Sequence, residues 1–151
     1  MPPEEKTLWK CPRCGAKFVT RNMWHSCGKF SLRAHFARSE PRVYRLYRRF
    51  VQLVRACGPV TIIPQKTRIA FQVRVRFAGI TPRKSYLLVG FWFTERRDHP
   101  RFFRIERYYP SAYGHFLRIE SDKDFDRDFK SWLRAAYAIG QQAHRRARRP
   151  S

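Results

Sequence analysis

The stretch RIAFQVRVRFAGITPRKSYLLVGFWF, residues 68–93, gives the clearest indication of the fold class. Apolar and polar side chains alternate over residues 68–80, which predicts one antiparallel strand with a buried face and a basic outer face. Residues 81–84 are typical of a turn, and residues 86–93 are apolar on both faces, as expected for a central strand. We therefore expect an antiparallel sheet at the centre of the protein.

Two amphipathic helices are predicted on either side of this region. The first covers residues 41–57, with Ser39 as its expected cap and Gly58-Pro59 as its stop. Cys57 ends the apolar stripe of this helix and is expected to be a core residue. The second helix is expected to begin after Ser121 and to end near residue 140.

Further strands are predicted at residues 60–63, 103–109 and 113–120. The prediction is an α+β fold: helix, about five mostly antiparallel strands, helix, with both helices on one sheet face. Four segments are expected: a disordered start at 1–8, a zinc-binding module at 9–38, the α+β domain at 39–143 and a basic tail at 144–151. No apolar run reaches the ~20 residues that a transmembrane helix needs.

The N-terminal module contains the side chains of a zinc site. Cys11 and Cys14 have the C-x2-C spacing that places two thiolates on one metal ion at ~2.3 Å, and Cys27 supplies a third. We expect His35, in a short helix of a finger- or ribbon-like module, to be the fourth ligand. His25 is the alternative, although its position two residues before Cys27 would crowd a tetrahedral site.

The predicted zinc ion is structural, because four protein ligands leave no position open for a substrate. With no secretory signal and few cysteines for its length, the chain favours a reducing, cytoplasmic compartment, and therefore a metal site over disulfides.

The net charge indicates an anionic partner. The chain has 33 basic and 11 acidic residues, a formal charge of +22, and most of the basic residues are arginine. The excess is largest between residues 41 and 121, where the folded domain is expected. Such a surface attracts polyanions, nucleic acid first and anionic membranes second. A GC-rich genome that favours arginine is the alternative explanation.

Several motifs together resemble a known family. They are CPRCG (11–15), WHSCG (24–28), LRAHF (32–36), GPV (58–60), PQKTRIAF (64–71) and WLRAAY (132–137). The combination, which covers nearly the whole chain, is similar to an uncharacterised bacterial family catalogued as domain of unknown function 5655. The resemblance implies a cytoplasmic single-domain protein with an N-terminal zinc module, in a family whose members often lack these cysteines. It implies no activity and no catalytic residues.

Two main hypotheses for function follow. The first is a non-catalytic nucleic-acid-binding protein whose arginines contact phosphates and whose aromatic-rich sheet stacks on bases. The expected phosphate contacts are Arg42, Arg45, Arg49, Arg68, Arg74 and Arg76.

The second hypothesis is a binder, or an enzyme, of a small anionic ligand in a pocket formed by Lys66, Arg107 and His115. A lone histidine in a strand is more often a hydrogen-bonded core residue than an acid–base catalyst. No carboxylate pair, nucleophile motif or glycine-rich phosphate loop is visible in the sequence, so binding is favoured over catalysis. A third hypothesis is that the protein is a module that binds an acidic protein.

Overall fold

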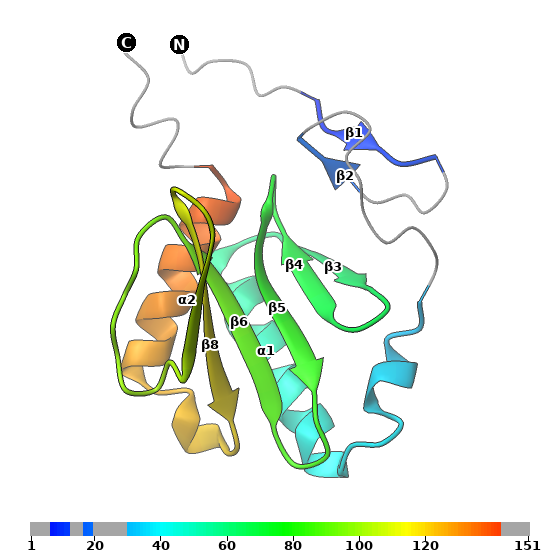
Figure 1. Cartoon of the computed structure of the whole chain (residues 1–151). Coiled ribbons are helices and arrows are strands. Elements are labelled where there is room, and N and C mark those ends of the chain that lie inside the picture. Colours follow the sequence, from blue (N-terminus) through cyan, green and yellow to red (C-terminus); the bar gives the residue numbers. More distant parts are fainter. Residues whose placement is uncertain (1–6, 13–16, 20–29, 143–151) are drawn as a thin grey trace.

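Six strands of the chain pair into one sheet, and every neighbouring pair is antiparallel. The computed structural model describes residues 7–12, 17–19 and 30–142 (Figure 1). The strands are β3 (Thr61–Pro64), β4 (Ile69–Gln72), β5 (Arg76–Pro82), β6 (Leu87–Phe93), β7 (Arg104–Tyr109) and β8 (Ala112–Ile119). Their order is β3-β4-β5-β6-β8-β7, so the apolar β6 lies between β5 and β8, away from both edges.

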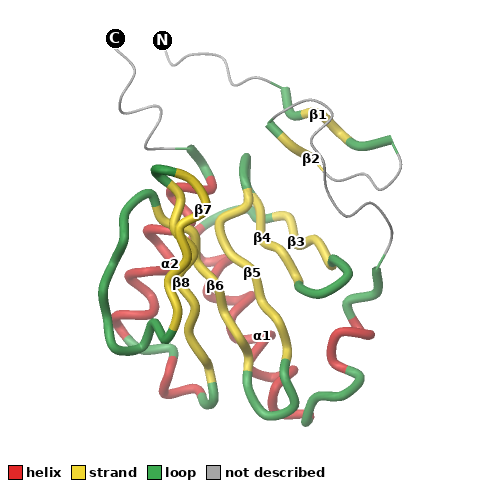
Figure 2. The backbone as a smooth tube through the Cα atoms, in the orientation of Figure 1, coloured by secondary structure: helices red, strands yellow, loops and turns green. Residues whose placement is uncertain are grey.

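Two helices cover one face of this sheet. α1 (Pro41–Cys57) and α2 (Arg127–Gly140) both lie behind the strands in Figures 1 and 2. Both helices contact β6 and each other, and α2 also contacts β5. The predicted α+β class and the placement of the helices on one face are confirmed.

Phenylalanine rings fill the space between the helices and the sheet. Phe50 of α1 packs edge-on against Phe71 of β4 and Phe129 of α2, with ring centroids 5.0 and 6.0 Å apart. Phe91 of β6 lies 5.4 Å from Phe129, and all four side chains are fully buried. Such ring pairs add ~0.5–1.5 kcal/mol each beyond the burial of apolar area. They join α1, α2 and two strands into one core.

The prediction of a single strand over residues 68–80 was wrong, and the sheet therefore has six strands instead of about five. β4 and β5 form a hairpin, and Val73, Arg74 and Val75 make the turn. The amides of Arg74 and Val75 donate to the Gly140 carbonyl at 2.8 and 3.1 Å, so the end of α2 holds this turn. The turn escaped the sequence pattern because it contains no Gly, Pro, Asn or Asp, and its two valines continue the apolar alternation.

α1 has the predicted bounds, but the caps of both helices and the start of α2 differ from the prediction for local reasons. Ser39 does not cap α1; its hydroxyl donates to the Arg83 carbonyl at 2.7 Å, and Glu40 occupies the cap position. Ser121 caps the short 3-10 helix η2 (Asp122–Asp124) instead of α2. α2 begins after Asp126, whose carboxylate accepts a hydrogen bond from the Phe129 amide at 2.9 Å.

The N-terminal segment contains a small hairpin of its own. β1 (Trp9–Lys10) pairs with β2 (Lys17–Phe18), and the short helix expected around His35 is the 3-10 helix η1 (Arg33–Phe36). The hairpin contacts the sheet because Gln72 donates to the Lys17 carbonyl and the Arg76 guanidinium lies 4.9 Å from the Phe18 ring.

Parts of the predicted organisation fall outside the described residues. These are residues 1–6 of the predicted N-terminal segment, the predicted tail at 144–151, and Cys14, His25 and Cys27 of the predicted zinc site. Within the described ranges, no helix is long and apolar enough to cross a membrane.

Candidate nucleic-acid interface

The outer side of α1 carries four arginines that we call the arginine ribbon: Arg45, Arg48, Arg49 and Arg55. The helix directs them outward because its apolar side chains recur every three or four residues on the opposite side, where they meet the sheet. All four are exposed. Among residues 7–12, 17–19 and 30–142, no carboxylate forms an ion pair with any of them.

Arg42, which was predicted to contact phosphate, makes several hydrogen bonds within the protein. Its guanidinium donates to the Glu40 carboxylate at 2.9 Å and to the carbonyls of Ser85 and Glu120 at 2.7 and 2.8 Å. These contacts tie the start of α1 to the β5–β6 turn and to the end of β8. We therefore exclude Arg42 from the ribbon.

The three predicted sheet arginines do not join the ribbon. Arg68 lies over the Trp92 ring at 5.1 Å and donates to the Gln65 side chain at 3.1 Å. Burial lowers the pKa of Arg68, as expected for a guanidinium enclosed by other side chains. Arg74 donates to the Gln142 side chain at 3.1 Å. Arg76 covers Phe18, so all three are engaged in contacts within the protein.

The sheet face opposite the helices combines glycines, rings and arginines. A Cβ atom at Gly79 would meet the Trp92 ring at 3.3 Å, and one at Gly90 would meet the Phe116 ring at 3.0 Å. Glycine is needed at these positions because the two rings lie directly on the backbone. Arg104 in turn lies 4.4 Å from the Phe116 ring. The aromatic surface that was predicted to stack on bases is thus covered by the protein's own arginines.

The predicted ligand pocket of Lys66, Arg107 and His115 is not assembled. Lys66 lies between β3 and β4, whereas Arg107 lies on β7 at the opposite edge of the sheet. His115 is fully buried: its Nε2 accepts from the Arg97 amide at 2.8 Å, and its Nδ1 donates to the Tyr113 carbonyl at 3.1 Å. Burial is the main cause that lowers its pKa. His115 is a neutral core histidine in this arrangement.

The described part of the predicted zinc site consists of Cys11 and His35. Cys11 is buried beside the end of β1. Nε2 of His35 lies 2.7 Å from the Gln65 carbonyl oxygen; since that oxygen can only accept, Nε2 donates, and Nδ1 is the ring nitrogen that could bind a metal. Within the described ranges no three His, Cys, Asp or Glu side chains form a metal-binding group. Cys14, Cys27 and the rival His25 lie outside those ranges.

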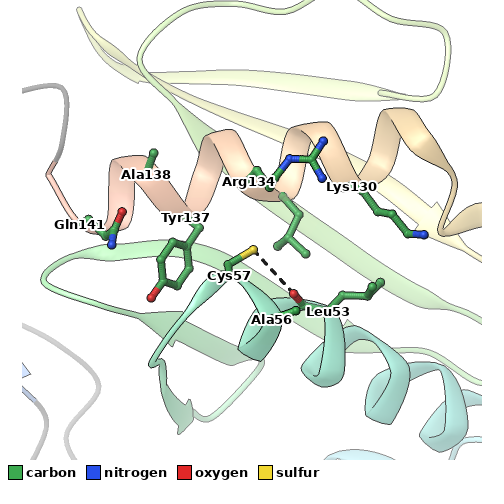
Figure 3. Close-up of a pocket in the computed structure, with 9 residues that line it drawn as sticks. Leu53, Ala56, Cys57, Lys130, Arg134, Tyr137, Ala138 and Gln141 are labelled. Carbon is green, nitrogen blue, oxygen red and sulfur yellow. Dashed lines mark hydrogen bonds between the residues drawn. The ribbon is translucent and has the colours of Figure 1, made fainter.

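A groove between α1 and α2 was not predicted from the sequence (Figure 3). It has a volume of about 540 Å³, with Lys130 and Arg134 of α2 among its lining residues. Cys57, which was predicted to be a core residue, packs against the core but is only half-buried and also lines the groove. The Tyr137 hydroxyl donates to the Pro59 carbonyl at 2.7 Å. Burial raises the pKa of both Cys57 and Tyr137, and both stay protonated near neutral pH.

The groove could not be predicted from the sequence because residues of both helices form it together. Leu53 and Leu133 belong to separate apolar stripes, and only the packing of the two helices leaves a gap between them. The sequence feature that could have indicated the groove is the spacing of Lys130 and Arg134, which places two cations one turn apart on α2.

Comparison with known proteins identifies the family and nothing more specific. The family model described as Domain of unknown function (DUF5655) matches residues 33–140. This range includes η1, both helices and the whole six-stranded sheet, and it excludes Cys11, Cys14 and Cys27. No curated protein and no solved structure matches the chain. Because the match covers most of its length, the chain belongs to this family.

Proposed function

We propose that this member of the DUF5655 family binds nucleic acid without catalysis and that the arginine ribbon of α1 contacts the phosphates. The observation that carries the proposal is the set of four exposed guanidiniums that have no carboxylate partner among the described residues. Within the ribbon, the Arg49 side chain makes a long hydrogen bond to Gln52 at 3.4 Å, whereas Arg42 donates to two backbone carbonyls at 2.7 and 2.8 Å and Arg68 to the Gln65 side chain at 3.1 Å.

The arginine ribbon places like charges close together, and their repulsion destabilises α1. Arg45 and Arg49 are four residues apart and Arg45 and Arg48 three, spacings at which like charges repel by ~0.2–0.5 kcal/mol per pair. A polyanion would remove this repulsion. Ten residues separate Arg45 from Arg55, about 15 Å along the helix, and the phosphates of one strand are spaced closely enough to meet several guanidiniums over that length. The planar guanidinium can also bind a phosphate through two hydrogen bonds.

A pair of double variants tests whether the ribbon is the binding surface. Arg45→Gln/Arg49→Gln removes two ribbon charges, and Arg104→Gln/Arg107→Gln removes two charges from β7 at the sheet edge. We expect the first pair to weaken binding of a labelled oligonucleotide by about fivefold or more, from ~0.5–1 kcal/mol per exposed contact, and the second by less than twofold. Equal losses would mean that total charge, not α1, governs binding. Absence of binding by the unchanged protein at low salt would reject the function itself.

A second candidate function is the binding of a small organic anion with an apolar tail in the α1–α2 groove. The observation in its favour is the combination of apolar side chains with the cations of Lys130 and Arg134 in one groove (Figure 3). Decanoate should then raise the melting temperature while decanol does not, and Lys130→Gln/Arg134→Gln should abolish the effect. No stabilisation by millimolar decanoate would reject this candidate.

We also propose that the N-terminal module holds a structural zinc ion on Cys11, Cys14, Cys27 and His35. The β1–β2 hairpin flanks the C-x2-C segment on both sides, and a hairpin is a common way to present such a pair of thiolates. A zinc-binding histidine usually donates its other ring N–H to a carbonyl, as Nε2 of His35 does to Gln65. When bound, the ion would supply structural stability and no reactive position.

A further inference from the structure

The flank of α1 that faces β3 and η1, away from the α1–α2 groove, is hollowed beside the arginine ribbon. Two adjoining hollows of about 420 and 570 Å³ share Leu32 and Tyr44 in their linings. The first continues along Val51 and Ile62, and the second extends to Phe36. The Tyr44 side chain therefore borders both spaces.

Tyr44 presents an aromatic ring that is held in place and partly open to solvent. The residue is 44% exposed. Its ring meets Phe36 edge-on at 5.1 Å and lies nearly parallel to Tyr47 at 6.1 Å. Phe36 and Tyr47 also contact each other at 5.1 Å, so three rings brace one another. A ring positioned this way is ready to stack on a planar ligand at a small cost in conformational freedom.

Cations lie in the same place as the ring. Arg48 and Arg55 line the hollow that Tyr44 and Tyr47 enter, and both belong to the arginine ribbon. Gln52, between them on the helix, adds an amide whose oxygen accepts from Arg49 at 3.4 Å and whose NH2 group can donate to a ligand. The surface thus combines a stacking ring, an amide and two phosphate-binding groups, which are the groups that recognise a nucleotide with an unpaired base.

We infer that the hollow beside Tyr44 binds an unstacked base of a single-stranded nucleic acid whose phosphates lie on the arginine ribbon. The inference rests on the proposed function and specifies its substrate. A double helix keeps its bases stacked and paired, so it can reach the ribbon through phosphates but cannot place a base against Tyr44. The protein should therefore bind a single strand more tightly than a duplex of the same length.

The test compares a fluorescein-labelled 12-nucleotide oligouridine with a 12-base-pair RNA duplex, both titrated with the full zinc-loaded chain at one salt concentration. Tyr44→Ala should weaken single-strand binding by about fivefold or more, since base–aromatic stacking has that magnitude, and should leave duplex binding unchanged. Tyr44→Phe should retain single-strand binding because it keeps the ring. Tyr109→Ala is the control, since Tyr109 is 71% exposed on β7 at the far edge of the sheet.

A crosslink gives a readout that does not depend on a variant folding. Irradiation of the unchanged protein with 5-bromouridine oligomer should attach the oligomer to the peptide that contains Tyr44, as identified by mass spectrometry. Equal affinity for single strand and duplex, or a crosslink elsewhere on the chain, would overturn the inference while leaving phosphate binding by the ribbon intact. Failure of both nucleic acids to bind would instead remove the proposed function on which the inference rests.

Discussion

Arg42 and Arg45 lie one helical turn apart on α1, and their surroundings give them different roles. Arg42 bonds to Glu40 and to two carbonyls of neighbouring loops, whereas Arg45 has no ion-pair partner among the described residues. The sequence makes the two look equivalent, because both fall on the polar side of an amphipathic helix. Only the distances to Ser85 and Glu120 distinguish them.

This difference predicts the effect of Arg42→Ala. Hydrogen bonds from a charged donor contribute ~1.5–3 kcal/mol when buried, but the Arg42 side chain is 45% exposed, so we expect a loss of about 1 kcal/mol in the free energy of unfolding. Affinity for an oligonucleotide should change less than twofold. Urea denaturation and a binding titration measure the two effects. A loss of affinity comparable to that of Arg45→Gln/Arg49→Gln would place Arg42 back in the binding surface.

His115 gives a prediction for pH dependence. Burial lowers its pKa below the ordinary value of 6.5, and the hydrogen bond to the Tyr113 carbonyl only partly opposes this. As the pH falls below 6.5, the unfolded chain therefore takes up a proton that the folded chain does not. The stability contributed by neutral His115 is present above pH 6.5 and is lost as the pH falls below it.

The comparison that isolates this effect uses His115→Gln, which keeps an acceptor for the Arg97 amide. The unchanged protein should lose more unfolding free energy between about pH 7.5 and about pH 5.5 than the variant does. Because other titrating groups are common to both proteins, the difference reports His115 alone. Identical pH profiles would contradict the assignment of a neutral buried ring.

At the scale of elements, periodicity decided what could be predicted. The apolar stripe of α1 predicted both its bounds and its buried side, because Val43, Phe50 and Val54 share one helical face. The alternation over residues 68–80 was read as one strand, since a period of two is unaffected by a turn that Val73 and Val75 happen to continue. The alternation predicted that these residues are extended. It could not predict the hairpin, whose turn is held by hydrogen bonds to the end of α2.

In the candidate interface, too, local periodicity predicted some features, and contacts between residues distant in sequence decided the others. The exposed position of Arg45 and Arg49 could be predicted because an amphipathic helix exposes its polar side wherever it packs. The roles of Arg68 and Arg76 depend on Trp92 and Phe18, which are far from them in sequence. The hollow beside Tyr44 requires η1, α1 and β3 to meet, and no local pattern carries that information.

The N-terminal hairpin gives a prediction about metal. Cys11→Ser should release zinc from the purified protein, since one of the proposed thiolates is lost, and should lower the protection of residues 9–36 in hydrogen exchange. Because the family match begins at residue 33, the sheet and helices should remain folded. Zinc content by mass spectrometry and hydrogen exchange give the two readouts.

Two histidine variants then decide the fourth ligand. His35→Ala should lose zinc, whereas His25→Ala should retain it. The reverse result would assign the position to His25. A purified unchanged protein without stoichiometric zinc would reject the metal site altogether.

At the scale of the whole molecule, the arginine ribbon of α1 and the sheet arginines, which were predicted to form one binding surface, lie on different sides of the sheet. α1 and α2 cover one face of the sheet (Figure 1), so the ribbon points away from the strands. Arg68 and Arg104 lie against the Trp92 and Phe116 rings of the opposite face. A charge of +22 draws polyanions to every side of such a molecule. Contact, as distinct from attraction, should occur where several exposed guanidiniums lie close together with no carboxylate partner among the described residues, as they do on the outer side of α1.

The salt dependence of oligonucleotide binding tests this claim most directly, because it counts the phosphates that the protein contacts. If all four ribbon arginines contact phosphate, the logarithm of the binding constant should fall with the logarithm of the salt concentration with a slope of about −3 for a single strand. Arg45→Gln/Arg49→Gln should halve that slope. A slope shallower than about −1 for the unchanged protein, or a slope that the double variant leaves unaltered, would show that the ribbon is not the contact surface.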